Sequence, residues 1–173
     1  MSVSLHTATV ARYLQILASI GGLIDKADEH CRDNGLPAEA LTEARLAEDM
    51  WPFAKQVQQC AHHSTGAIES VRVGVFRPKP DPVPTDFASL RAQIAAATTA
   101  LLAIDPEELE RLAGRETRFE FGERSMRFIA SDFLLSFSMP NFYFHSTVAY
   151  AILRAQGLPV GKRNFLGSPS ILA

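Results

Sequence analysis

Apolar residues recur at steps of three and four near the start of the chain, which is the spacing of one face of an α-helix. The pattern predicts a long helix over residues 7–32. The pair Asn34-Gly35 follows it. Because both residues adopt the left-handed conformation readily, the pair predicts the end of this helix. A short helical piece is expected next, through Ala44.

A second long helix is predicted to start near Asp49 and to run to about Val71. Proline is tolerated in the first turn of a helix, so Pro52 fits this start, and the Asp49 carboxylate can cap the exposed amide groups. The middle of the helix is unusually polar, with Gln56, Gln58, Gln59, His62 and His63. Neighbouring residues of a helix point about 100° apart. We therefore expect no more than one of the two adjacent histidines to face the interior and the other to meet solvent.

Prolines then occupy alternate positions, which excludes a helix over residues 75–85 and favours an extended connector. These prolines are Pro78, Pro80, Pro82 and Pro84. Thr85 or Asp86 is expected to cap a third helix. Its apolar residues form a heptad-like stripe, which is typical of a core face. The stripe comprises Leu90, Ile94, Ala97, Leu101 and Ile104.

Between residues 117 and 128 the period changes to two, because phenylalanines alternate with charged residues. Gly122-Glu123 interrupts the alternation. A glycine that leads a two-residue loop favours a type II′ β-hairpin. We expect this small hairpin to close one end of the molecule.

The fourth helix is predicted from Ser131 or Asp132 to about Gln156, where Gly157 ends it. It is apolar around most of its circumference and carries His145 at its centre. A buried histidine requires a hydrogen-bond partner. Pro140 removes one backbone hydrogen bond, which predicts a kink in this helix.

These elements predict an all-α fold, a four-helix bundle with a small β-hairpin inserted between the third and fourth helices. The 173 residues fit a single domain over residues 1–173, with a C-terminal tail from about residue 158. Glycines bracket two cations in the tail segment 161–167. This segment is expected to pack on the surface, with the binding of an anion as the alternative.

Charge and cysteine usage narrow the function classes. The net charge of −2 and the pI near 6.2 argue against a nucleic-acid partner, which would need a basic surface. Cys31 and Cys60 lack the spacing of a disulfide framework or a zinc ribbon, which favours a reduced, cytoplasmic setting. The start of the chain does not have the pattern of a secretory signal, and we expect no membrane partner.

Three roles are open for His145. It can be a core residue bonded to a glutamine or asparagine, a metal ligand, or part of a small-molecule pocket. The residues expected at such a pocket are His145, Asn141, Asp49, Gln56 and Gln59, with aromatic walls from Trp51, Phe53, Phe142 and Tyr143. For a metal, the candidate ligands are His145, His62 and His63, with Asp49 or Asp132 at helix starts. Asparagine is a poor ligand for a transition metal, so the fourth helix lacks a second ligand next to His145.

Three segments carry a resemblance to a known family: residues 45–58 (RLAEDMWPFAKQVQ), 140–154 (PNFYFHSTVAYAILR) and 161–167 (GKRNFLG). Over nearly its whole length the chain resembles the DUF1993 family of unknown function, which is similar to the DinB/YfiT-like superfamily of four-helix bundles. Many members of that superfamily hold a divalent metal with one histidine on the second helix and two, four residues apart, on the last helix. Several dimerise.

By this resemblance His145 matches one ligand on the last helix, and His62 or His63 matches the ligand on the second helix. Ala149 occupies the position of the remaining ligand. The ligand set is incomplete, so the resemblance implies the fold and leaves open whether the protein is an enzyme.

The main hypothesis is a cytoplasmic homodimer that binds a small molecule at a polar pocket around His145, needs no cofactor, and is a metal-degenerate relative of the DinB-like proteins. One alternative is a divalent-metal-dependent enzyme of the thiol-transferase or hydrolase type. The other is a purely structural dimer.

Overall fold

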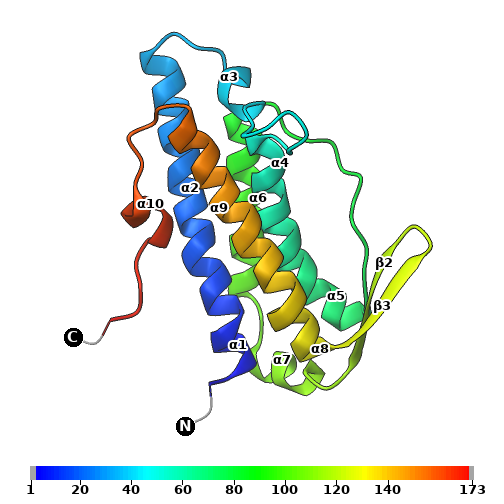
Figure 1. The fold of residues 1–173 in the computed structure, drawn as a ribbon. Helices are drawn as coiled ribbons and strands as arrows, with labels where there is room; N and C mark the ends of the chain where they lie inside the picture. Colours follow the sequence, from blue (N-terminus) through cyan, green and yellow to red (C-terminus); the bar gives the residue numbers. More distant parts are fainter. Residues whose placement is uncertain (1–2, 172–173) are drawn as a thin grey trace.

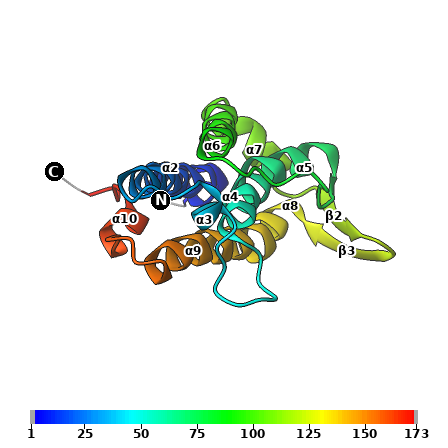
Figure 2. The same cartoon turned by 90° about the horizontal axis from the view of Figure 1, so that it is seen from above.

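The computed structural model describes residues 3–171. Four long helical segments lie side by side (Figure 1), and the view along the bundle shows them around a common axis (Figure 2). The first is α2 (Val10–Asp33), preceded by α1 (Leu5–Ala8). The second is α4 (Phe53–Ala61), continued by the π-helix η1 (His62–Gly66) and by α5 (Ala67–Val73). The third is α6 (Phe87–Leu102), and the fourth is η2 (Phe133–Ser138), a π-helix, followed by α9 (Met139–Ala155). The predicted four-helix bundle is confirmed.

Shorter helices connect and flank these four: α3 (Glu39–Thr42), α7 (Pro106–Leu112), α8 (Ala130–Asp132) and α10 (Lys162–Leu166). The predicted end of the first helix is confirmed, since Asn34 caps α2 and Gly35 has a φ of 64°. The last short helix, α10, packs against α2, where the Gln15 side chain donates a hydrogen bond of 2.9 Å to the carbonyl of Leu166.

The predicted start of the second helix is wrong. The helix begins at Phe53, with Pro52 as its N-cap and no side-chain cap. The preceding segment folds back on itself, because the amide of Phe53 donates a hydrogen bond of 2.8 Å to the carbonyl of Ala44. Asp49 lies exposed in this loop and caps no helix.

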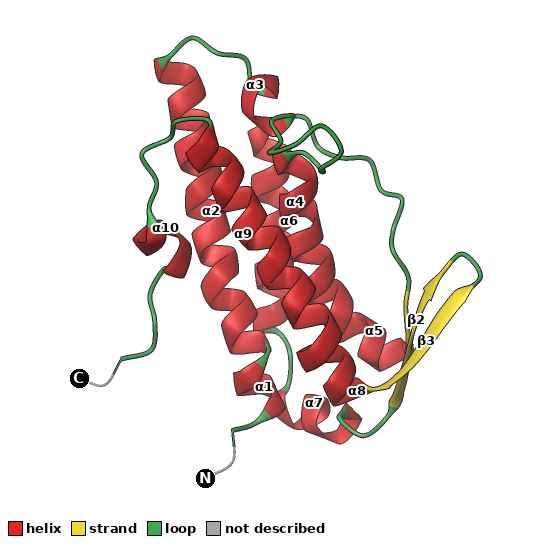
Figure 3. Cartoon of the chain, viewed as in Figure 1, coloured by secondary structure: helices red, strands yellow, loops and turns green. Residues whose placement is uncertain are grey.

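A three-stranded sheet lies at one end of the bundle beside α5 (Figure 3). The predicted hairpin is its larger part, with β2 (Glu116–Phe121) antiparallel to β3 (Arg124–Ile129). Gly122 has a φ of 58°, and no non-glycine residue in the described part of the chain has a positive φ, which fits the type II′ turn. The short strand β1 (Val75–Phe76) was not predicted and pairs in parallel with β2.

The contact between α2 and α6 forms the regular part of the core. The predicted stripe is buried, although its last residue, Ile104, lies just beyond the end of α6 at Leu102. Asp86 caps this helix by accepting a hydrogen bond of 2.7 Å from the amide of Ser89. On the surface of the same contact, Arg91 pairs with Asp25 and Asp28 at 2.6 and 2.5 Å.

The helix over Leu5–Asp33 is long and apolar enough to cross a membrane, yet half of its most apolar window is buried inside the bundle. It packs against other helices, as the core helix of a soluble protein does.

The second and fourth segments both depart from α-helical geometry at the same level of the bundle. The irregularity of the fourth helix, η2, ends immediately before the pair Met139-Pro140. Because Pro140 has no amide hydrogen, the carbonyl four residues earlier cannot be paired in the α-helical way. Ser138 joins the two π-helices, since its hydroxyl donates a hydrogen bond of 2.8 Å to the carbonyl of His63.

Candidate functional site

A cavity of about 330 Å³ opens where the two π-helices meet the hairpin and the proline-rich segment. Its lining combines aromatic rings, imidazoles and two lysines. The lining residues are Trp51, Lys55, Gln59, His62, His63, Phe76, Pro78, Lys79, Phe119, Phe121, Phe137, Asn141 and His145. We refer to it as the imidazole cavity.

His145 is buried, with 6% of its surface exposed. Its Nδ1 lies 2.7 Å from Oε1 of Gln56, and the amide nitrogen of Gln56 donates a hydrogen bond of 3.0 Å to the carbonyl of Trp51. Since the Gln56 amide is oriented by that second bond, its oxygen accepts a hydrogen from Nδ1 of His145. The proton of the neutral ring therefore sits on Nδ1, and Nε2 keeps a free lone pair. This contact is the one expected if His145 is a core residue paired with a glutamine, which is one of the three roles left open for it.

Three imidazoles lie next to one another. His63 is 7% exposed and stacks on His145 with ring centroids 5.6 Å apart, while the Trp51 ring stacks on His145 at 5.7 Å. His62 lies beside His63, also with centroids 5.6 Å apart.

The expectation that one of His62 and His63 would meet solvent is wrong, because both line the imidazole cavity and His62 is half-buried. Two physical reasons explain this. The π-helix adds a residue to the turn, which reduces the angle between neighbouring side chains. The proline-rich segment also covers His62, as Pro78 and Lys79 line the same cavity.

Burial lowers the pKa of all three imidazoles, because a charged ring loses its hydration there. The pKa of His145 is lowered to about 4 by burial, and then by repulsion from His62, once that ring is protonated at low pH, and from Lys55. For His63 the pKa is lowered to about 3 by burial and by the two neighbouring imidazoles. The pKa of His62 is lowered to about 4 by burial and by Lys79 and Lys55. All three rings are neutral at pH 7.

The lining of the imidazole cavity carries two formal charges, and both are positive. Lys55 and Lys79 line the imidazole cavity, and the lining contains no aspartate or glutamate. The Lys55 ammonium is held in place, since it donates a hydrogen bond of 2.6 Å to Gln58 and lies 5.6 Å from the centroid of the Trp51 ring. The cavity therefore favours an anionic group over a cationic one.

The structure brings together some of the residues expected at the pocket. Four of them line the cavity: Trp51, Gln59, Asn141 and His145. Gln56 does not line the cavity but accepts the hydrogen bond from His145. The amide nitrogen of Asn141 donates a hydrogen bond of 2.7 Å to the carbonyl of Phe137, so this side chain also supports the irregular backbone before Pro140.

Other expected residues lie elsewhere. Asp49 and Asp132 are exposed and outside the cavity. Phe53 and Phe142 are fully buried in the core, and Tyr143 packs against Phe142 with centroids 5.7 Å apart.

Sequence reasoning missed the two lysines and the phenylalanines of the cavity. Lys79 lies in a segment interpreted only as a connector. Phe119 and Phe121 lie on β2, where their alternation with charged residues predicted the strand. The same alternation placed both rings on one face of the hairpin, which was the available signal for an aromatic wall.

The residues present do not fit the divalent metal that the superfamily implies. Neutral imidazoles are suitable donors. However, no group of three or more histidine, cysteine, aspartate or glutamate side chains within residues 3–171 is arranged to hold an ion. The lining also brings two ammonium groups and no carboxylate, and Ala149 is buried where the remaining ligand would lie. No chemical step is therefore assigned to a metal.

Comparisons agree with this architecture. Residues 5–166 match the family described as Domain of unknown function (DUF1993), and the chain belongs to this family. A crystal structure of a DinB family member protein from Shewanella denitrificans superposes with a TM-score of 0.83. The two chains are 26% identical, and the match covers 98% of this chain and 95% of the other. No curated protein matches the chain. The resemblance to DUF1993 and to the DinB-like superfamily is confirmed.

Proposed function

We propose that the protein binds a small organic anion with an aromatic body in the imidazole cavity. The observation that carries this proposal is the lining itself, in which two lysines and three neutral imidazoles stand among aromatic rings without a carboxylate. A carboxylate can accept hydrogen bonds from the ammonium groups, while its aromatic body packs against the phenylalanines. The volume of about 330 Å³ accommodates a ligand of one ring with a short chain.

His145 has a defined part in this proposal. Its Nε2 carries a free lone pair, because the Nδ1 hydrogen is donated to Gln56. It can therefore accept a hydrogen bond from a ligand hydroxyl or amide, and it cannot donate one to the carboxylate. The charge of the ligand is assigned to Lys55 and Lys79.

Calorimetric titration with 3-phenylpropionate tests the proposal, with 2-phenylethylammonium as a probe of similar body and opposite charge. We expect the anion to bind and the cation not to bind. Lys79→Gln should lower the affinity for the anion by about five- to tenfold, which is the effect of losing one charged contact. Lys162→Gln, on the distant α10, should not change the affinity. Equal binding of both probes, or none, would contradict the proposal.

Elemental analysis separates this function from a metal-dependent enzyme. The neutral imidazoles, with Nδ1 of His145 fixed by Gln56, are the feature that favours a metal. Stoichiometric nickel, zinc or manganese that is lost in His145→Ala with unchanged helicity would overturn the anion proposal. We expect substoichiometric metal.

The homodimer stays a prediction. Two apolar side chains on the fourth helical segment support it, since Phe144 is 56% exposed and Leu135 is 43% exposed. Light scattering should give twice the chain mass, and Phe144→Ser should shift the protein toward monomer. The matched change Leu102→Ser, at an exposed residue of α6, should leave the mass unchanged. A monomeric wild type would contradict this prediction.

A further inference from the structure

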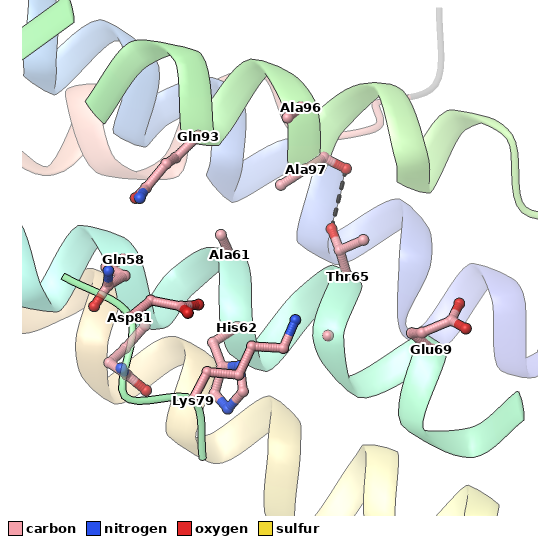
Figure 4. A pocket seen from close by; sticks show the side chains of 12 residues that line it. Gln58, Ala61, His62, Thr65, Glu69, Lys79, Asp81, Gln93, Ala96 and Ala97 are labelled. Carbon is pink, nitrogen blue, oxygen red and sulfur yellow. Dashed lines mark hydrogen bonds between the residues drawn. The ribbon is translucent and has the colours of Figure 1, made fainter. Parts of the chain in front are cut away.

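A second cavity, of about 410 Å³, lies between the second helical segment and α6. Gln59, His62 and Lys79 line both this cavity and the imidazole cavity, so the two adjoin at these three side chains. Small residues of the facing helices, Ala61 and Ala97, leave the space open (Figure 4). We refer to this space as the α6 cavity.

Two buried polar atoms along this path have no hydrogen-bond partner in the described residues. They are Nε2 of His62, at the junction, and Oε1 of Gln93, on the wall formed by α6. Buried polar groups are normally paired, so each of these atoms indicates a missing partner. An acceptor such as Oε1 of Gln93 needs a hydrogen-bond donor, and a ligand ammonium group can supply one.

The α6 cavity differs in charge from the imidazole cavity. Asp81 and Glu69 line the α6 cavity, whereas the imidazole cavity has no carboxylate. Glu69 is already paired with Arg72 at 3.2 Å, while the exposed Asp81 takes part in no salt bridge within residues 3–171. Figure 4 shows Asp81 and Gln93 toward one end of the α6 cavity and Lys79 extending across His62 near its middle.

From this arrangement, and resting on the proposed function, we infer that the ligand is a short aromatic zwitterion that occupies both cavities. Its ring lies in the imidazole cavity, its carboxylate lies at Lys79 on the junction, and its terminal ammonium lies in the α6 cavity. There the ammonium donates hydrogen bonds to Gln93 and to the Asp81 carboxylate. A dipeptide with a C-terminal aromatic residue has this order of groups.

Titration calorimetry with glycyl-phenylalanine tests the inference. N-acetylglycyl-phenylalanine lacks the ammonium, and 3-phenylpropionate lacks the whole extension. We expect the free dipeptide to bind about two- to fivefold more tightly than either, the gain from one ion pair with the exposed Asp81 carboxylate. Asp81→Asn should remove this gain, whereas Asp33→Asn, at an exposed aspartate at the end of α2, should retain it.

A second variant blocks the α6 cavity without touching the core. Ala96 lines this cavity and is exposed to solvent, so Ala96→Leu should fold normally. It should reduce dipeptide binding to the level of 3-phenylpropionate and leave the affinity for 3-phenylpropionate unchanged. If 3-phenylpropionate binds and the dipeptide gains nothing, or if the gain survives both Ala96→Leu and Asp81→Asn, the inference is overturned and the proposed function stands. If no anion binds, both fail.

Discussion

The contact of α2 with α6 and the contact of the second with the fourth helical segment bury different kinds of groups. In the first, the buried side chains of α6 are an apolar stripe, and the charged pairs of Arg91 stay on the surface. In the second, His63, His145 and Gln56 are buried, and both segments contain a π-helix. His63 and Ser138 lie within the π-helices themselves, whereas Gln56 and His145 lie in the adjoining α-helices α4 and α9. Single π-helical turns of this kind are common at functional sites.

This comparison assigns stability to the first contact and ligand chemistry to the second. The largest expected effect is on the apolar side. Leu90 is fully buried in α6, so Leu90→Ala should lower the free energy of unfolding in urea by about 2–5 kcal/mol, through lost burial and the cavity left behind. The exposed Leu102 of the same helix is the control, and Leu102→Ala should change stability by less than about 0.5 kcal/mol. Under conditions in which both variants are fully folded, their affinities for 3-phenylpropionate should be equal. A weaker affinity in Leu90→Ala alone would contradict the assignment.

The pH dependence of stability sharpens the comparison from the polar side. The imidazoles have pKa values of about 3 to 4 in the folded protein, against 6.5 as the ordinary value. The unfolded chain therefore binds more protons between these values, and stability falls as the pH decreases below about 6.5. The stabilising contribution of the neutral rings is fully present above that pH.

For His63 the dependence amounts to at most about 1.4 kcal/mol per pH unit. Urea unfolding measured between pH 7 and pH 4 gives the free energy of unfolding as a function of pH. Its slope should be steeper for the wild type than for His63→Gln, because glutamine does not titrate. Equal slopes would mean that His63 is not held neutral by burial.

A smaller effect is expected from the hydroxyl that joins the two π-helices. Ser138→Ala should lower the free energy of unfolding by about 1–3 kcal/mol, toward the lower figure, because the carbonyl of His63 loses its buried partner. Ser136 is a matched control, since its hydroxyl bonds only to the carbonyl of Asp132 within the same helix and is exposed. Ser136→Ala should have an effect within about 0.5 kcal/mol. Similar losses of unfolding free energy in both variants would contradict the claim that the Ser138 hydroxyl stabilises the contact between the two π-helices.

The sequence predicts the regular helices and turns well and the contact of the second with the fourth helical segment only in part. The stripe of α6, the glycine stops after α2 and α9, and the hairpin turn at Gly122 depend on local periodicity and turn chemistry, and all were predicted correctly. The start of the second helix was placed at Asp49 because a carboxylate before a proline is a good local cap, but the loop folds back onto Ala44 and moves the start to Phe53.

The site was predicted only in part, because it depends on contacts between distant segments. His145 and its glutamine partner could be anticipated from burial alone. The inward positions of both His62 and His63 could not, since they require a π-helix and a covering segment. Lys79 reaches the cavity from a proline-rich connector, and no periodic pattern there indicates which side chain turns inward.

The protonation state of His145 tests the central claim most directly. Long-range proton–nitrogen NMR correlations report which ring nitrogen carries hydrogen. At pH 7 the account predicts a neutral His145 with its hydrogen on Nδ1, and Gln56→Leu should abolish this preference. An imidazolium at pH 7, or a neutral ring with its hydrogen on Nε2, would contradict the account.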